Sequence, residues 1–227
     1  MCDYAVELTD NAQTTREVPV DYPALPRAFY TRPTLEVARA LLGKTLMRRS
    51  AEGLVGGIIV ETEAYVSASD AAAHGHRGPT PRTASMQGPP GHAYIYFTYG
   101  MHYCLNCVTE PTGTSAAVLL RAVQPTLGLD LMRARRTPHT VEHNLTRGPA
   151  RLCQAFALTR ADDGLDLTGD TLWISETPGW DEDAPVATSP RIGISRAADL
   201  PWRFYVAGSL WVSGPVAVRA PSGRLPQ

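Results

Sequence analysis

Lysine is almost missing from this chain of 227 residues, because Lys44 is the only one and the remaining positive charge is carried by arginine. An enzyme that forms a Schiff base with a sugar needs a neutral amine, which arginine cannot supply because its guanidinium stays protonated. Lys44 follows Leu41, Leu42 and Gly43, a context typical of a solvated helix end. The sequence therefore disfavours amine catalysis.

Long apolar runs are also lacking, so no segment is expected to cross a membrane. The first ten residues carry acids where a signal peptide has a basic patch followed by an apolar run. We therefore expect an intracellular protein, in the cytoplasm or nucleoid if the source is bacterial.

Cysteine is scarce, and only Cys104 and Cys107 of the four are close in sequence. That spacing gives no disulfide framework, so reduced thiols are expected. The pair could suggest redox chemistry or zinc, but structural zinc takes four ligands and no second Cys or Cys/His pair is suitably spaced. We expect no metal site.

The chain has no excess of positive charge, since 21 Lys and Arg face 22 Asp and Glu. Proteins that bind nucleic acids usually have a basic balance. Residues 1–21 and 162–183 together hold 13 of the acids and a single arginine, which leaves 9 acids and 20 basic residues elsewhere. A basic surface for phosphate contacts is therefore compatible with the sequence but is not established by it.

The length and the 44% hydrophobic content predict one domain with a full core. We place it at residues 26–213, between flexible segments at 1–25 and 214–227 that show no sustained pattern. The expected fold class is α/β (α+β), a mixed, largely antiparallel curved sheet with surrounding helices. Strands are predicted at 45–49, 54–65, 116–123, 172–174, 191–195 and 203–207, helices at 34–42 (with Thr34 as N-cap), 127–136 and 149–158, and a long loop at 66–91.

Residues 94–106 are typical of a protruding β-hairpin whose turn is supplied by Gly100. Alternation along the first strand puts Tyr94 and Tyr96 on one face. Tyr99 lies beside the glycine, where a bulky ring cannot fold back into the core of its own strands. Such a ring could wedge between base steps, as in a DNA enzyme that extracts a base, or it could staple neighbouring loops.

The strand that begins at Val60 combines carboxylates with an aromatic ring. Alternation puts Glu61, Glu63 and Tyr65 on one face and Val60 on the other. The pattern fits a catalytic site, and it also fits an edge strand that exposes charge to water. Arg121 of a neighbouring strand could pair with a glutamate and keep Glu63 ionised, as a water-activating base requires.

A set of motifs occurs in order between about residues 26 and 213. It comprises Glu63-Ala64-Tyr65, His74, residues 94–106, Leu119-Leu120-Arg121, residues 147–154, Arg191-Ile192-Gly193-Ile194, residues 203–206 and Trp211-Val212-Ser213. Together these motifs resemble the alkyladenine (3-methyladenine) DNA glycosylase family. The resemblance implies a monomer, free of metal and cofactor, that hydrolyses the N-glycosidic bond of alkylated or deaminated purines in double-stranded DNA. The product would be an abasic site in an uncut strand, so no lyase activity is expected.

The resemblance also implies roles for individual residues. Glu63 would activate the attacking water, and Arg121 would help to hold that water. Tyr99 would intercalate where the base has left the helix, and Asn106 would crowd the exocyclic amino group of an undamaged guanine. The walls of the pocket around the flipped base would be formed by Tyr65, His74 and Tyr96.

Contacts with the DNA backbone are predicted at Arg77, Arg147 and Arg151. The last two flank the start of the helix that Pro149 opens, whose free amides could hold a phosphate. An ordinary surface helix start is the alternative.

Some positions depart from the family pattern. Residues 66–70 read Val-Ser-Ala-Ser-Asp where many relatives have Gly-Pro-Glu-Asp, Thr83 replaces Asn, and Gln87 replaces an aromatic residue. All three differences lie in the long loop, so they bear on lesion preference more than on bond hydrolysis.

Two other functions remain open from the residues alone. One is a glycoside hydrolase that uses Glu61 and Glu63, although neighbours on one strand lie side by side rather than flank a sugar. The other is a non-catalytic nucleic-acid-binding module on the same fold. Its expected sign, loss of the residue at Glu63 or Arg121, is absent.

Overall fold

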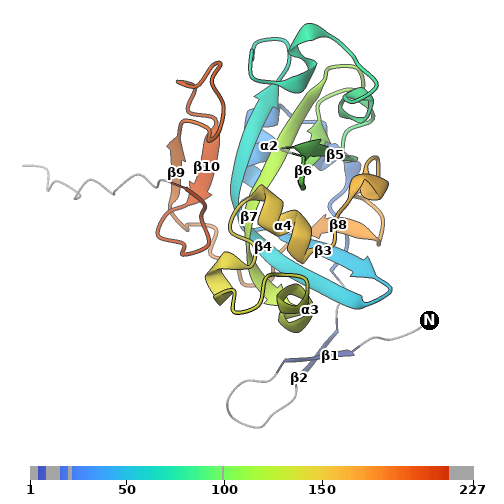
Figure 1. The fold of residues 1–227 in the computed structure, drawn as a ribbon, viewed down its shortest axis with the longest axis vertical. Helices are drawn as coiled ribbons and strands as arrows, with labels where there is room; N and C mark the ends of the chain where they lie inside the picture. The colour runs from blue at the N-terminus through green and yellow to red at the C-terminus, as the bar shows by residue number, and fades with distance from the viewer. Residues whose placement is uncertain (1–4, 9–15, 20–21, 99, 215–227) are drawn as a thin grey trace, which may run out of the picture.

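An eight-stranded antiparallel sheet forms the centre of the computed structural model, which describes residues 5–8, 16–19, 22–98 and 100–214 (Figure 1). The strand order is β5-β6-β7-β4-β10-β9, and β3 pairs with both β4 and β8. The strands are β3 (Thr45–Ser50), β4 (Gly53–Val66), β5 (Ala93–Thr98), β6 (His102–Thr109), β7 (Ala116–Leu127), β8 (Leu172–Ser175), β9 (Val186–Ser189) and β10 (Arg203–Val206). The predicted α/β class with a largely antiparallel sheet is confirmed.

Strand β4 organises the sheet because its 14 residues pair with three other strands. β7 runs along one edge, while β3 and β10 follow one another along the opposite edge. A side chain at Gly57 would lie 2.7 Å from the Gln124 carbonyl oxygen, so glycine permits the close approach of β7. The pairing of β4 with β7 shifts register on both sides of Glu61. Val60 packs in a small cluster with Tyr205 and not in the main core, so the predicted strict alternation of side chains between the two faces of β4 was wrong at this point.

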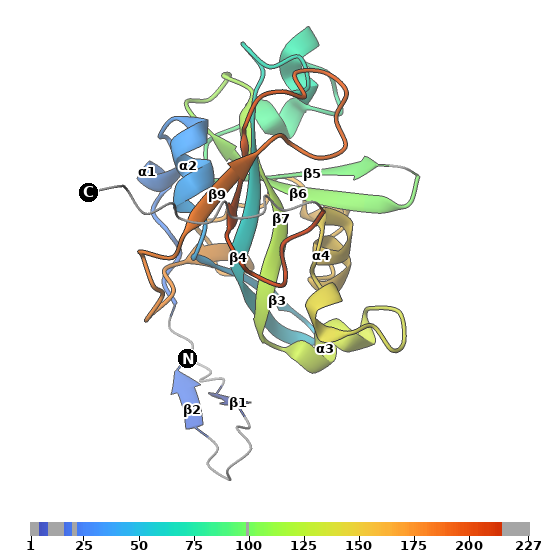
Figure 2. The same ribbon diagram turned by 90° about the vertical axis from the view of Figure 1, so that its left-hand side faces the viewer.

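Within the described residues, four short α-helices surround the sheet: α1 (Arg27–Tyr30), α2 (Thr34–Ala40), α3 (Leu129–Ala134) and α4 (Pro149–Ala155). α2 packs against β4 and β7, and α4 packs against β6 and β7. Figure 2 shows the β5–β6 hairpin extending from the sheet on the side where α4 lies, away from α1 and α2. The predicted cap was wrong, because the Thr34 hydroxyl contacts Glu110 and Thr109 instead of a helix amide.

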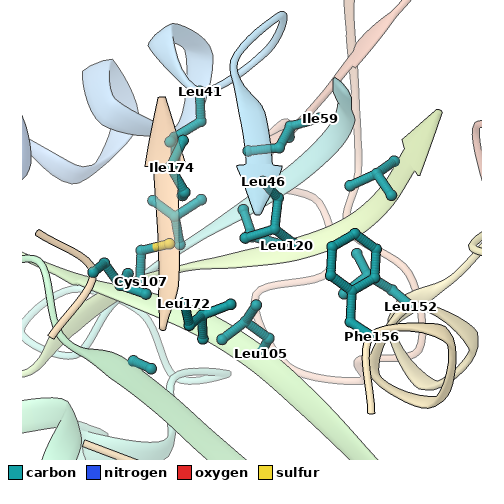
Figure 3. Packing of buried hydrophobic residues seen from close by; sticks show 14 of the residues in the cluster. Leu41, Leu46, Ile59, Leu105, Cys107, Leu120, Leu152, Phe156, Leu172 and Ile174 are labelled. Atoms are coloured by element: carbon teal, nitrogen blue, oxygen red, sulfur yellow. The ribbon is translucent and has the colours of Figure 1, made fainter. Parts of the chain in front are cut away.

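The main core lies between the central strands and the helices, and Figure 3 shows part of it. Ile59 of β4 and Leu120 of β7 are completely buried there, as are Leu41, next to α2, and Leu152 of α4. Each fully buried aliphatic side chain contributes about 1.5–3 kcal/mol relative to an exposed one. The core therefore fixes β4 and β7, which carry the glutamates and the arginine singled out in the sequence.

The segment at residues 191–195 is not a strand, which corrects the prediction. Its glycine, Gly193, has φ 77°, a left-handed conformation that interrupts extended structure. The strand of this region is β9, which begins five residues before the predicted strand and pairs with β10.

The predicted N-terminal segment contains an antiparallel pair, β1 (Ala5–Leu8) and β2 (Arg16–Pro19). The chain joins the main sheet at Ala24, which bridges to Ser175 of β8, and Leu25 is buried in the core. Across the described part of the chain, no helix has the length and apolar character needed to span a bilayer.

Candidate active site

A cavity of about 350 Å³ opens between the base of the β5–β6 hairpin and the segments that follow β4 and β9. Its lining residues are Tyr65, Ala72, His74, Met86, Tyr94, Tyr96, Thr98, Cys104, Asn106, Leu119, Arg121, Pro149, Ile192, Gly193 and Ile194. All four sequence-predicted pocket residues, Tyr65, His74, Tyr96 and Asn106, thus lie in one place. The volume lies at the lower end of the range for small-molecule sites.

Aromatic rings of the hairpin form one wall of the cavity. Tyr94 and Tyr96 project from the same face of β5, and their ring centroids are 5.4 Å apart. The ring of His74 meets that of Tyr96 edge-on at 4.5 Å, and its Nδ1 lies 2.8 Å from the Tyr94 hydroxyl. Desolvation by these neighbours, together with the positive charge of Arg82, lowers the pKa of His74. The histidine is therefore neutral at pH 7 and can either donate or accept a hydrogen bond.

Tyr65 also lines the cavity, and its hydroxyl contacts a buried carboxylate. Its hydroxyl donates to Oε2 of Glu63 at 2.8 Å, and Glu63 is completely buried. Burial, followed by the charge of Glu63, raises the pKa of Tyr65, so the hydroxyl remains a donor. The backbone N–H of Ile192 donates to the other oxygen, Oε1, at 2.8 Å. Glu63 therefore lies immediately behind the cavity wall.

Arg121 of β7 bridges the two glutamates of β4. Its Nη1 is 3.2 Å from Oε2 of Glu63, and its Nε donates to Oε1 of Glu61 at 3.1 Å. Burial on its own would lower the pKa of Arg121, but the two carboxylates outweigh that effect and raise it. The guanidinium therefore keeps its charge beside both carboxylates.

Glu61 is fully occupied by structural contacts. Besides Arg121, it accepts hydrogen bonds from Arg203 Nε at 2.7 Å and from the amide and hydroxyl of Ser213 at 2.7 and 3.0 Å. It is completely buried and does not line the cavity. The two glutamates lie side by side on one strand, joined through an arginine, which is unlike the opposed pair of a glycoside hydrolase.

The floor of the cavity comes from β6, where Cys104 and Asn106 share one face. The Asn106 amide nitrogen donates to the Tyr94 carbonyl at 2.9 Å, so the side chain is fixed and its oxygen remains for a bound molecule. The Cys104 thiol is buried, which raises its pKa and keeps it protonated. It is therefore a packing group and a poor nucleophile.

The predicted DNA-contacting residues have different surroundings. Tyr99 lies outside the described residues. Among the residues that flank it, the Met101 amide donates to the Thr98 carbonyl at 3.3 Å. Arg77 is exposed beside a shallow groove that continues from the cavity. Arg151 is exposed and donates to Asn144, whereas Arg147 uses its Nε to hold the Val212 carbonyl at 2.7 Å. Arg147 is therefore at least partly structural.

Two residues of the site were missed from the sequence. Tyr94 could have been assigned to the pocket, because it shares a strand face with Tyr96. Ile192 lies in one of the family motifs but was assigned no role, because it contributes a backbone N–H that only the folded chain brings to Glu63.

Within the ranges that the structure describes, no group of three or more His, Cys, Asp or Glu residues could hold a metal ion. The cavity lining instead offers a fixed cation and electron-rich rings, with the Glu63 carboxylate directly behind it. Such a set can stack a planar ligand and accept a proton from a water molecule beside it.

The fold and this site together define an α/β protein in which a tyrosine-lined cavity beside an eight-stranded sheet lies in front of a buried acid. A sequence profile described as methylpurine-DNA glycosylase matches residues 28–210. The chain belongs to the methylpurine-DNA glycosylase family.

Individual relatives agree with this assignment. A Burkholderia lata protein, provisionally named 3-methyladenine DNA glycosylase, is 52% identical over 86% of this chain and 93% of its own length. Proteins of the same provisional name from Methanocella arvoryzae and Chlorobaculum parvum are 46% and 48% identical. These matches cover 84% and 82% of this chain and 96% and 88% of the relatives.

Proposed function

We propose that this protein is a monofunctional DNA glycosylase of base excision repair. It would act as a monomer on double-stranded DNA, rotate a damaged purine out of the helix and hydrolyse its N-glycosidic bond with a water activated by Glu63. The observation that carries this proposal is the hydrogen bond between Glu63 and Tyr65, because it joins a buried acid to the wall of an aromatic cavity. Family membership supports the same reaction class.

Recognition of the base would rest on stacking in the cavity. A purine alkylated at a ring nitrogen is cationic, and a cation over an aromatic face gains roughly 0.5–2 kcal/mol. Tyr65 of β4 and Tyr96 of β5 both contribute rings to the cavity lining. Deaminated purines such as hypoxanthine are neutral, and they would depend on hydrogen bonds with His74 and on the fixed amide of Asn106.

Bond cleavage would use the contacts of Glu63. Oε2 is held by Tyr65 and Arg121, whereas Oε1 has one donor among the described residues, the Ile192 amide, and can accept a second hydrogen bond. Water would approach Oε1 from the cavity, between Tyr65, Arg121 and Ile192, which all line it. Because no lysine lies at the cavity, a water nucleophile fits and the strand would stay uncut.

Binding of the duplex would involve the hairpin and the basic residues beside it. Tyr99 is proposed as the wedge from its place next to Gly100, whose φ of 68° is suited to a tight turn. Arg77 and Arg151 are exposed and are the stronger candidates for phosphate contacts. Arg147 remains a candidate through its other guanidinium nitrogens.

The decisive experiment measures free bases released from methylated and inosine-containing duplexes, followed by a test of the strands for nicks. We expect a released purine, an abasic site and no nick until the product is treated with alkali. Intact substrate would refute the proposal, and spontaneous nicking would refute its monofunctional part. Polysaccharide substrates serve as the control for the glycoside hydrolase alternative.

A further inference from the structure

Two buried residues, to which the proposed function assigns no role, face one another behind the cavity. Arg191 opens the segment that lines one side of it, and Asp70 lies in the loop that follows β4. Both side chains are 0% exposed. The guanidinium binds the carboxylate through two nitrogens, with Nη2 donating to Oδ1 at 2.8 Å and Nη1 to Oδ2.

The same guanidinium also binds two backbone carbonyls. Nη1 donates to the Ala64 oxygen at 2.8 Å, and Nη2 donates to the Ala197 oxygen at 3.2 Å. Arg191 thus ties together the end of β4, the loop after it and the segment at 191–197. A buried ion pair is a poor source of fold stability, because desolvation offsets much of its attraction. The Asp70–Arg191 pair instead links two segments that line the cavity, which indicates a role in positioning them.

The plane of the guanidinium supports an aromatic ring of the cavity. Its central carbon lies 4.5 Å from the ring centroid of Tyr65 and 5.2 Å from that of Trp202. Tyr65 is therefore held at two points, through its ring face by Arg191 and through its hydroxyl by Glu63. The next residue along the chain, Ile192, supplies the amide that donates to Glu63.

We propose that Asp70 and Arg191 form a positioning pair, which sets both the Tyr65 ring and the Ile192 amide against Glu63. This inference rests on the proposed function. The pair touches neither substrate nor water, so its loss should lower the rate of bond cleavage and leave duplex binding almost unchanged. A displacement of about 1 Å at a catalytic group can reduce a rate by up to about a hundredfold.

The test compares single-turnover base release with duplex affinity in Asp70→Asn and Arg191→Lys. Asp70→Asn keeps the shape and removes the charge, while Arg191→Lys keeps the charge but loses the two-pronged contact and the stacking plane. The matched control is Asp162→Asn, which breaks the Arg48–Asp162 ion pair (2.6 Å; side chains 13% and 10% exposed) away from the cavity. All variants are assayed well below their melting temperatures.

We expect Asp70→Asn and Arg191→Lys to lose about tenfold or more in rate while Kd for the lesion duplex stays within about threefold. Asp162→Asn should lower the melting temperature and keep the rate within about twofold. Unchanged rates in the two cavity variants, or a loss in the control of the same size, would overturn the inference. So would failure of both cavity variants to fold, because the pair would then be purely structural. If the wild-type protein releases no base, the proposed function fails instead.

Discussion

Replacement of Glu61 by glutamine tests how the charges behind the cavity are balanced. Oε1 of Glu61 accepts from Arg121, Arg203 and Ser213 Oγ, and Oε2 accepts from the Ser213 amide. Glutamine can keep the oxygen in only one of these positions, so its NH2 group meets at least one donor. The substitution also removes one of the two buried negative charges beside Arg121 and the carboxylate that pairs with Arg203.

The magnitude follows from these contacts. Removing one partner of a buried ion pair costs about 3–5 kcal/mol, because the remaining charge stays buried. For a chain of this size each kcal/mol lowers the melting temperature by about 2–4 °C, so Glu61→Gln should melt about 6–20 °C below the wild type. Base release should also slow, because Arg121 loses one of the two carboxylates that orient it.

Denaturation by guanidinium chloride, followed by circular dichroism, measures this free energy directly. Glu176→Gln is the control, because Glu176 pairs with Lys44 at 2.5 Å but is 66% exposed. An exposed pair contributes about 1 kcal/mol or less. A loss in Glu61→Gln no larger than that of the control would refute the buried charge balance.

Three further outcomes are expected. Leu120→Ala should reduce the free energy of unfolding by about 2–5 kcal/mol in denaturant titrations, because Leu120 is completely buried in the core, and a loss below about 1 kcal/mol would contradict that packing. Tyr65→Phe removes a donor to Glu63 and should slow single-turnover base release by about tenfold, whereas an unchanged rate would show the hydroxyl to be dispensable. Folding lowers the pKa of His74 below 6.5, so the unfolded chain binds more protons and the stability of the wild type should fall as the pH drops below 6.5. The melting temperature of His74→Gln should therefore fall less than that of the wild type between neutral and acidic pH. An equal fall in both proteins would contradict the lowered pKa.

The sequence predicted those elements whose pattern is local. Strands β3, β4 and β7 appear where alternation and apolar runs indicated them, and Pro149 opens α4 as expected. The alternation is interrupted where β4 shifts register against β7, at Gly56–Gly57 and on both sides of Glu61. The hairpin was equally clear, because Gly100 separates two runs rich in aromatic and β-branched residues.

The errors arose where tertiary contacts override local preference. Ile192 and Ile194 suggested a strand, yet this segment turns at Gly193 and gives the Ile192 amide to Glu63. Neither composition nor spacing distinguishes Glu61 from Glu63. Only the folded structure shows that Glu61 is surrounded by Arg121, Arg203 and Ser213, whereas Glu63 contacts residues of the cavity wall.

The central claim is that the Glu63 carboxylate activates water beside the cavity, and Glu63→Gln tests it most directly. The substitution keeps the shape of the side chain and removes its ability to accept a proton. In single-turnover assays on the lesion duplex that the wild type cleaves fastest, we predict unchanged binding and a loss of base release of about a hundredfold or more. Base release at the wild-type rate by this variant would contradict the claim.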